Sequence, residues 1–243
     1  MIYFYHKMLF KDKKKGKFLS MEQLNPTQNI AIDLIILGFD KENEVVKLYA
    51  PERDLDFLKG KRALPGVLLK HGESIADAVE RTITTKTPLK LSKLKSYHLQ
   101  ELPAQTNPDR DPRGHVVSIP ILVITKLSSE DVNNDQWLDF NQGLELAFDH
   151  SRMVDLSYEL LAKNIKENPL PLLMLEGLIP LEDARNVISH FDGSFKEMYL
   201  SNFKKVYPTE KFLKETNESP KVKQKGRQVK LYKVNKRSIK NIF

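Results

Sequence analysis

Apolar residues occur along this chain in short runs that polar turns separate, and the runs before residue 126 predict a sheet. Residues 30–38, IAIDLIILG, are apolar and β-branched, which indicates a buried strand with one charged residue, Asp33, inside it. After a polar turn, residues 44–50 predict the returning strand. Further strands are predicted at residues 67–69, 94–101 and 116–126.

Apolar residues at helical spacing predict two helices in the same part of the chain. The first follows Ser74, which suits an N-cap because Asp77 stands at the capping-box position. Its apolar face comprises Ile75, Ala78, Val79 and Ile83. The second lies within residues 143–165, and its apolar face comprises Val154, Tyr158, Leu161 and Ile165. Strands around a central helix predict an α/β/α sandwich.

Asn168, Pro169 and Pro171 interrupt this pattern and predict a domain boundary near residues 168–175. Residues 180–188 then predict a helix with acidic residues in its first turn. The core face of this helix comprises Leu181, Ala184, Val187 and Ile188.

Residues 198–206 predict another helix, with Leu200, Phe203 and Val206 pointing inward. Residues 223–234 predict two short strands around a turn at residues 225–227. A helix, a turn, a helix and a basic hairpin together have the layout of a winged helix-turn-helix. We therefore predict an N-terminal extension at residues 1–28, an α/β sandwich domain at 29–168 and a winged helix-turn-helix domain at 169–243.

Charge supports this division. Residues 196–243 contain 14 Lys and Arg against 4 Asp and Glu, whereas the rest of the chain has a net charge of −3. A basic module joined to a nearly neutral body indicates nucleic acid as a partner. A solvated, lysine-rich tail is the alternative interpretation.

The composition of the chain limits the cellular compartments in which we expect the protein. The chain has no cysteine, which excludes disulfides and thiolate metal sites and fits a reducing compartment. The apolar run at the start is too short for a signal peptide, and no apolar stretch reaches the roughly 20 residues of a membrane-spanning helix. We expect a cytoplasmic protein without a membrane partner.

Residues 64–89, LPGVLLKHGESIADAVERTITTKTPL, resemble the Nudix box. The family pattern is a glycine, five residues, Glu, seven residues, then Arg-Glu-apolar-any-Glu-Glu-any-Gly, and here Glu73 and Arg81 lie at that spacing. Gly66 keeps the first of the two glycines usually found, and Val67 stands where the second belongs. The resemblance implies the Nudix fold; an ordinary strand, turn and helix with chance similarity is the alternative.

The same helix departs from the family at the positions that bind Mg²⁺. Thr82, Thr85 and Lys86 replace the three glutamates, and Pro88 replaces the closing glycine. Residues three and four apart share a helical face, so we expect two hydroxyls and an ammonium where the ion needs carboxylates. We therefore predict a Nudix fold without hydrolytic activity, which means no enzyme, no metal and no cofactor.

Two more segments are similar to the NrtR type of Nudix-related transcriptional regulators. One is the loop 107–114, NPDRDPRG, followed by VVSIP, together with Lys59-Gly60-Lys61 before the box, and the other is LAFDH at 146–150. In the loop, arginines suit phosphate or ribose hydroxyls, while aspartates hold the arginines or the sugar. We predict ligand contacts from Arg53, Lys61, Arg62, Glu73, Arg81, Asp109, Arg110, Asp111 and Arg113.

Two alternatives concern the residues around this site. The loop 107–114 also suits a surface turn, stiffened by its prolines, whose charges pair locally. Asp149 and His150 lie near the start of a predicted helix, where we favour a helix cap with a solvated histidine over a metal or catalytic pair.

The segments PLEDARNVI, SNFKK and KGRQVKLYKV resemble the DNA-binding half of the same regulators. The resemblance implies that the second helix enters the major groove of DNA and that the wing follows the backbone. The predicted DNA contacts are Ser201, Asn202, Lys204, Lys205, Lys225, Arg227 and Gln228. A winged helix that docks protein or forms a dimer is the alternative.

Together these features predict a ligand-responsive transcriptional regulator with a catalytically degenerate Nudix domain. The resemblance implies a homodimeric repressor that binds double-stranded operator DNA, controls genes of cofactor (NAD) or sugar metabolism and responds to ADP-ribose or a related nucleotide or sugar metabolite. An active Nudix pyrophosphohydrolase of a nucleotide sugar such as ADP-ribose is the alternative function.

Overall fold

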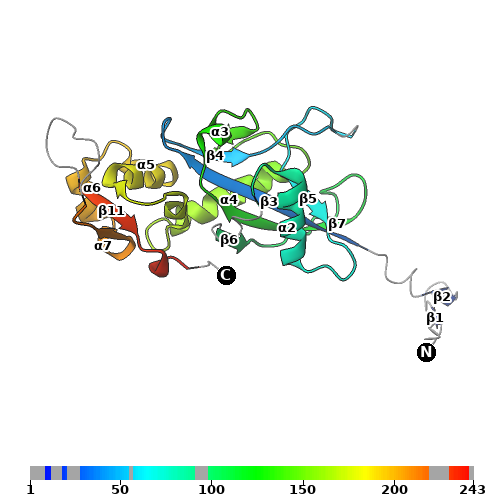
Figure 1. The fold of residues 1–243 in the computed structure, drawn as a ribbon. Helices are drawn as coiled ribbons and strands as arrows, with labels where there is room; N and C mark the ends of the chain where they lie inside the picture. The colour runs from blue at the N-terminus through cyan, green and yellow to red at the C-terminus, as the bar shows by residue number, and fades with distance from the viewer. Residues whose placement is uncertain are drawn as a thin grey trace.

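A computed structural model describes residues 9–11, 18–20, 28–54, 57–90, 98–218 and 230–240 (Figure 1). Its centre is a mixed six-stranded sheet in which β3 lies parallel to β7 and antiparallel to its other partners. The strand order is β6-β7-β3-β4-β8, and β5 also pairs with β3. These strands are β3 (Asn29–Asp40), β4 (Val45–Tyr49), β5 (Gly66–Leu68), β6 (His98–Glu101), β7 (Val116–Ile124) and β8 (Trp137–Asp139).

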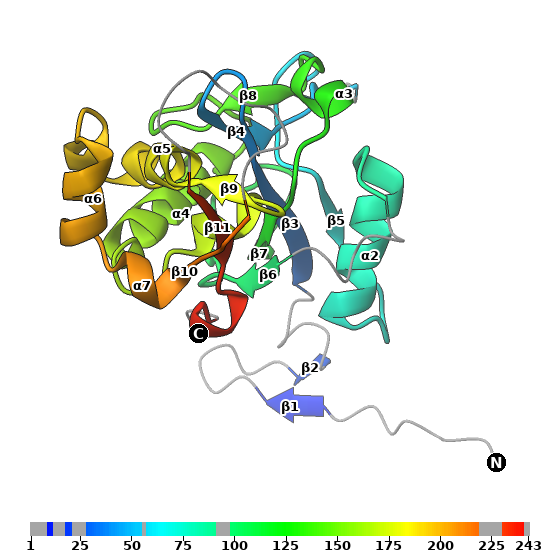
Figure 2. The ribbon, with the colours of Figure 1, turned by 60° about the vertical axis from the view of Figure 1, so that its left-hand side comes forward.

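The predicted α/β/α sandwich is confirmed, and alternation along β3 explains its layers. Ile32, Leu34 and Ile36 pack with the apolar face of α2 (Ile75–Lys86), while Ile35, Leu37 and Phe39 face α4 (His150–Asn164). Figure 2 shows α2 and α4 on opposite sides of β3. The predicted capping box is present, since the Ser74 Oγ accepts from the Asp77 N–H while the Asp77 carboxylate accepts from the Ser74 N–H.

The C-terminal part has the strand arrangement of a winged helix. A three-stranded sheet has the order β10-β11-β9, with α5 and α6 between β9 and β10. The bounds are β9 (Ile179–Pro180), α5 (Leu181–Phe191), α6 (Leu200–Val206), α7 (Thr209–Phe212), β10 (Leu213–Glu215) and β11 (Leu231–Val234). The four residues predicted for the core face of α5 are all buried.

One prediction about this part was wrong, and another lies outside the described residues. β11 pairs with β10 on one edge and with β9 on the other. The strand predicted directly before β11 and the turn at residues 225–227 lie outside the described residues. Val206 is 62% exposed, because Tyr207, 2% exposed, takes the inward position one residue later.

The two parts share one apolar cluster. It runs from Ile35 and Leu37 of β3 through α4 and α5 to Val234 of β11. The predicted boundary region, residues 168–175, contains the short 3₁₀ helix η2 (Leu170–Met174), whose residues are mostly buried. The Tyr207 hydroxyl donates to the Ile165 carbonyl at 2.7 Å, and the Tyr158 hydroxyl donates to the His190 carbonyl at 2.7 Å. α4 is therefore in direct contact with the C-terminal part through both hydrogen bonds and apolar packing.

The remaining elements are short. β1 (Leu9–Lys11) and β2 (Phe18–Ser20) pair antiparallel in a sheet of their own. The others are α3 (Ser129–Val132) and two 3₁₀ helices, η3 (Gly193–Phe195) and η4 (Lys236–Ser238). In the part of the chain that the structure describes, no helix is long and apolar enough to cross a membrane.

Candidate functional site

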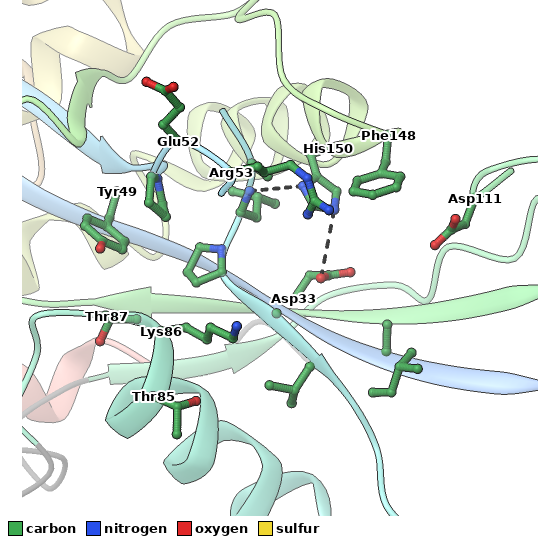
Figure 3. Close-up of a pocket in the computed structure, with 18 of the residues that line it drawn as sticks. Asp33, Tyr49, Glu52, Arg53, Thr85, Lys86, Thr87, Asp111, Phe148 and His150 are labelled. Atoms are coloured by element: carbon green, nitrogen blue, oxygen red, sulfur yellow. Dashed lines mark hydrogen bonds and ion pairs between the residues drawn. The ribbon is translucent and has the colours of Figure 1, made fainter. Parts of the chain in front are cut away.

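A pocket of about 720 Å³ opens beside β3, where several loops meet the ends of α2 and α4. Its floor is formed by residues of β3 and β5, and its walls come from the loop after β4, the loop before β7 and the last turn of α2 (Figure 3). Polar and charged lining residues include Asp33, Glu52, Arg53, Asp54, Thr85, Lys86, Arg110, Asp111, Arg113 and His150.

Asp33, the charged residue inside the apolar strand, lies on the pocket floor and is 6% exposed. It faces the α4 side of the sheet, as its odd position in the alternation requires. Its Oδ2 accepts from the Ser118 hydroxyl at 2.6 Å, and its Oδ1 lies where a side chain on Gly66 would have to be. A Cβ at Gly66 would stand only 2.0 Å from that oxygen, so this glycine permits the close approach of β5 to the carboxylate.

His150 is buried, so the prediction of a solvated histidine was wrong. Its Nδ1 accepts from the Leu64 N–H at 3.0 Å, and its Nε2 lies 3.9 Å from Asp33 Oδ1 (Figure 3). Burial lowers the pKa of His150, and the nearby Asp33 and Asp149 only partly oppose that effect. Through its hydrogen bond with the Leu64 N–H, the ring holds the segment before β5 against the start of α4.

Asp149 does not cap α4 with its side chain either. Its two oxygens accept from Arg110 Nε at 2.9 Å and Arg110 Nη2 at 2.7 Å. The Arg110 side chain is 3% exposed and also lies 3.6 Å from Asp33 Oδ2. This pair ties the loop before β7 to Asp149, the residue directly before α4.

Arg53 and Arg113 share an aromatic platform. Their guanidinium carbons lie 4.9 Å and 4.8 Å from the centre of the Phe148 ring, and the Phe57 ring lies 6.0 Å from Phe148. Phe148 has a φ of 58°, a left-handed conformation that is strained for a bulky residue. Arg113 donates to both oxygens of Asp111 and thereby lowers the pKa of Asp111. Aromatic and guanidinium groups side by side suit a ligand that combines a planar base with phosphates.

The α2 positions that correspond to the box glutamates do not share one face as predicted. Thr82 is fully buried, with its hydroxyl donating to the Ala78 carbonyl, because it continues the apolar face of the helix. Thr85 and Lys86 do line the pocket. Glu73 forms an ion pair with Arg81, which donates to both carboxylate oxygens at 2.7 Å. These hydrogen bonds are the main reason that the pKa of Glu73 is lowered to about 2.

These donors do not fit the Mg²⁺ that a Nudix fold implies. The ion prefers several carboxylate oxygens, whereas this helix offers the pocket a hydroxyl and an ammonium. In the described part of the chain, no three His, Asp or Glu side chains form a group that could hold a metal ion.

The structure brings four of the nine predicted ligand residues to the pocket: Arg53, Arg110, Asp111 and Arg113. The others lie outside its lining. Asp109 and Lys61 are exposed, Arg62 donates to the Ala50 carbonyl, and Glu73 and Arg81 bind each other. Sequence analysis assigned no ligand role to Asp33, Lys86, Phe148 or His150, although a lone aspartate inside an apolar strand was a usable signal.

The outer face of α6 is a second candidate site. Ser201, Asn202 and Lys205 are exposed, whereas Phe203 is fully buried. The Lys204 side chain has two partners: its Nζ donates to the Glu215 carboxylate at 2.8 Å and lies over the Tyr232 ring. Lys204 and Lys230 lower the pKa of Glu215 to about 2. The predicted wing contacts Lys225, Arg227 and Gln228 lie outside the described residues.

Comparisons with known proteins place these features in context, although no family model matches the chain. It is 35% identical over 130 residues to an ADP-ribose pyrophosphatase from Methanocaldococcus jannaschii, an alignment that covers 51% of this chain and 70% of that protein. It is 23% identical over 171 residues to the ADPR responsive transcriptional repressor NtrR of Acinetobacter baylyi, which covers 67% of this chain and 66% of the repressor.

Solved structures extend the likeness to the whole fold. Crystal structures of Shewanella oneidensis NrtR match with a TM-score of 0.69 for the protein and 0.65 for its complex with a 27mer DNA, each at 18% identity. The two matches cover 88% and 86% of this chain and 97% and 94% of those chains. Both parts of the chain are therefore found together in one known architecture.

Proposed function

The chain belongs to the Nudix family, with the two-part architecture of its NrtR-type regulators, and on that premise we propose that it is a ligand-responsive transcriptional repressor. The C-terminal winged helix binds operator DNA, and the Nudix-like part senses a small molecule and does not hydrolyse it. A protein with this role works on DNA, so we expect it in the cytoplasm.

The observation that carries the DNA-binding proposal is the outer face of α6. Ser201, Asn202 and Lys205 are exposed together on a helix whose opposite face is anchored by Phe203. Asn202 and Ser201 have the hydrogen-bonding groups that read base edges, and Lys205 supplies a phosphate contact. Lys204 and the wing residues Lys225, Arg227 and Gln228 complete the proposed contact set.

We propose ADP-ribose or a related nucleotide or sugar metabolite as the effector. The pocket holds aromatic rings for a base and arginines for phosphates, and the names of both curated relatives refer to ADP-ribose. Arg53 and Arg113 contact the phosphates, while Arg110 and Asp111 hold the pocket wall in place. Among the other residues predicted to bind ligand, those outside the pocket lining have no contact role in this proposal.

The effector acts on DNA binding through α4. Arg110 holds the first turn of α4 through Asp149, and Ile165 at its other end accepts the Tyr207 hydroxyl next to α6. In a homodimer, the two α6 helices must lie about one DNA turn, ~34 Å, apart to engage a near-palindromic operator. A ligand that favours another spacing releases the DNA and so relieves repression.

Selection of genomic DNA fragments on the purified protein, followed by fluorescence anisotropy, tests this function. We expect binding to a selected duplex that weakens steeply with salt and is released by ADP-ribose. Asn202→Ala should weaken the specific complex by about tenfold or more, since one good base contact is worth ~1–3 kcal/mol. The matched control Asn141→Ala, an exposed asparagine of the other part, should bind like the wild type. A complex insensitive to salt, or none with any fragment, would leave a protein-docking role for the winged helix.

The second candidate function is hydrolysis of ADP-ribose, and the relative from Methanocaldococcus jannaschii favours it. Incubation with Mg²⁺ and ADP-ribose, with detection of AMP and ribose 5-phosphate, tests it directly. We expect no turnover, because the pocket face of α2 lacks carboxylates. Turnover that survives Lys86→Ala and disappears in Glu73→Gln would establish the enzyme instead.

A further inference from the structure

The ammonium group of Lys86 is available to a ligand in the pocket. It occupies the last turn of α2, lines the pocket and is exposed. In the described part of the chain, no carboxylate lies within ion-pair distance of its ammonium. Figure 3 shows the side chain extending from the end of α2 into the space between the other lining residues. A cation in the last turn is also favoured by the helix dipole.

The other cations of the pocket divide into those paired with a carboxylate and those without such a partner among the described residues. Arg110 is held by Asp149, and Arg113 is held by Asp111. Within the described ranges, the Arg53 side chain donates to the Phe57 carbonyl and no carboxylate lies at ion-pair distance from it. Glu52, which lines the same wall, points away from the other labelled side chains in Figure 3. Arg53 and Lys86 are therefore the pocket cations that no carboxylate of the described residues pairs with, and an anionic ligand meets them in addition to Arg113.

Two chemistries can hold a diphosphate at the end of such a helix. Carboxylates repel phosphate and need a divalent cation between them, whereas an ammonium binds phosphate oxygens directly. The helix presents the second chemistry here, because Thr82 is buried, Thr85 is neutral and bonded to the Arg81 carbonyl, and Lys86 is cationic.

We propose that Lys86 takes the place of the divalent cation and binds the diphosphate of the effector directly, together with Arg53, so that this pocket binds a nucleoside diphosphate sugar without metal. The inference rests on the proposed function of the pocket and adds the means by which it holds the effector. Lys86 is thus a specificity residue for the diphosphate, with no part in cleavage.

Isothermal titration calorimetry of the full chain with ADP-ribose, in excess EDTA and in excess MgCl₂, tests the proposal. We expect the wild type to bind equally well in both buffers. Lys86→Ala should bind about ten- to a hundredfold more weakly, as expected for loss of a hydrogen bond between charged groups. Lys86→Arg should retain most of the affinity. The matched control Lys163→Ala, an exposed lysine of α4 outside this pocket, should behave as the wild type.

Two further measurements separate a direct contact from a structural role. Lys86→Glu should lose binding in EDTA and regain part of it in Mg²⁺, because a carboxylate at this position restores a need for the cation. Adenosine, which has no phosphate, should bind the wild type and Lys86→Ala with the same affinity. Thermal unfolding of the variants should match the wild type, since Lys86 is exposed.

The outcomes distinguish the two proposals. If the wild type binds ADP-ribose only in Mg²⁺, or if Lys86→Ala binds it as the wild type does, the Lys86 inference is overturned while the effector assignment stands. If the wild type binds ADP-ribose in neither buffer, the proposed effector is overturned, and the Lys86 inference with it.

Discussion

Arg110 in the wall of the pocket and Lys205 on α6 have opposite surroundings. The Arg110 side chain is 3% exposed and lies between Asp149 and Asp33, whereas Lys205 is exposed, and among the described residues no carboxylate lies at ion-pair distance from it. Fixed, desolvated charges recognise one small ligand by its shape, because they cannot rearrange around another. Exposed charges suit a polyanion, whose phosphates form a continuous track and whose binding depends on salt.

The largest effect should come from breaking the buried pair of the pocket. Asp149→Ala leaves the Arg110 guanidinium buried without its bidentate partner, so we expect the free energy of unfolding to fall by about 3–5 kcal/mol. Urea denaturation measures this change. As a control, Asp54→Ala removes a carboxylate from an exposed pair with Lys59 and should cost about 1 kcal/mol or less. Equal losses in the two variants would mean that the pair between Arg110 and Asp149 stabilises the fold no more than an exposed ion pair does.

A comparable effect should identify the inner face of α6. Phe203 is fully buried against Phe195 and Tyr207, so Phe203→Ala should destabilise the protein by about 3–5 kcal/mol. Val206, on the same helix, is 62% exposed, and Val206→Ala should change the free energy of unfolding by about 0.5 kcal/mol or less. The reverse order in thermal or urea unfolding would show that α6 presents its other face to solvent.

A smaller effect should separate the two lysines of α6. Lys205→Ala should reduce the slope of log affinity for DNA against log salt by about one, as loss of one phosphate contact does. Lys204 is bound to Glu215, so Lys204→Ala should reduce that slope less. Anisotropy titrations over a range of KCl concentrations measure both slopes. A larger change for Lys204 would show that its ion pair opens on DNA.

The smallest effect should be a change in the free energy of unfolding at low pH. Lys204 and Lys230 hold the pKa of Glu215 at about 2, below its ordinary 4.5, because they donate hydrogen bonds to its carboxylate. A lowered pKa in the folded state contributes stability above pH 4.5 that is lost as the pH falls toward about 2. The difference in unfolding free energy between the wild type and Glu215→Gln should therefore shrink across that window. A difference that stays constant with pH would exclude the ionised carboxylate as its source.

Sequence patterns determined the elements and their faces. The apolar, β-branched run at residues 30–38 predicted β3, the capping box predicted the start of α2, and helical spacing predicted the buried face of α5. These features depend on neighbours within a few residues, where backbone geometry alone decides which side chains share a face. The order of helices and basic residues likewise indicated the winged helix.

Tertiary structure alone decided how distant segments meet. Asp33, Arg110, Asp149 and His150 form one network only because β3, the loop before β7 and α4 converge at one place. The partner of β11 and the inward turn of Thr82 were likewise settled by packing. The physical reason is that local periodicity says which face of an element is apolar, but the burial of polar groups depends on the partners that the fold brings to them.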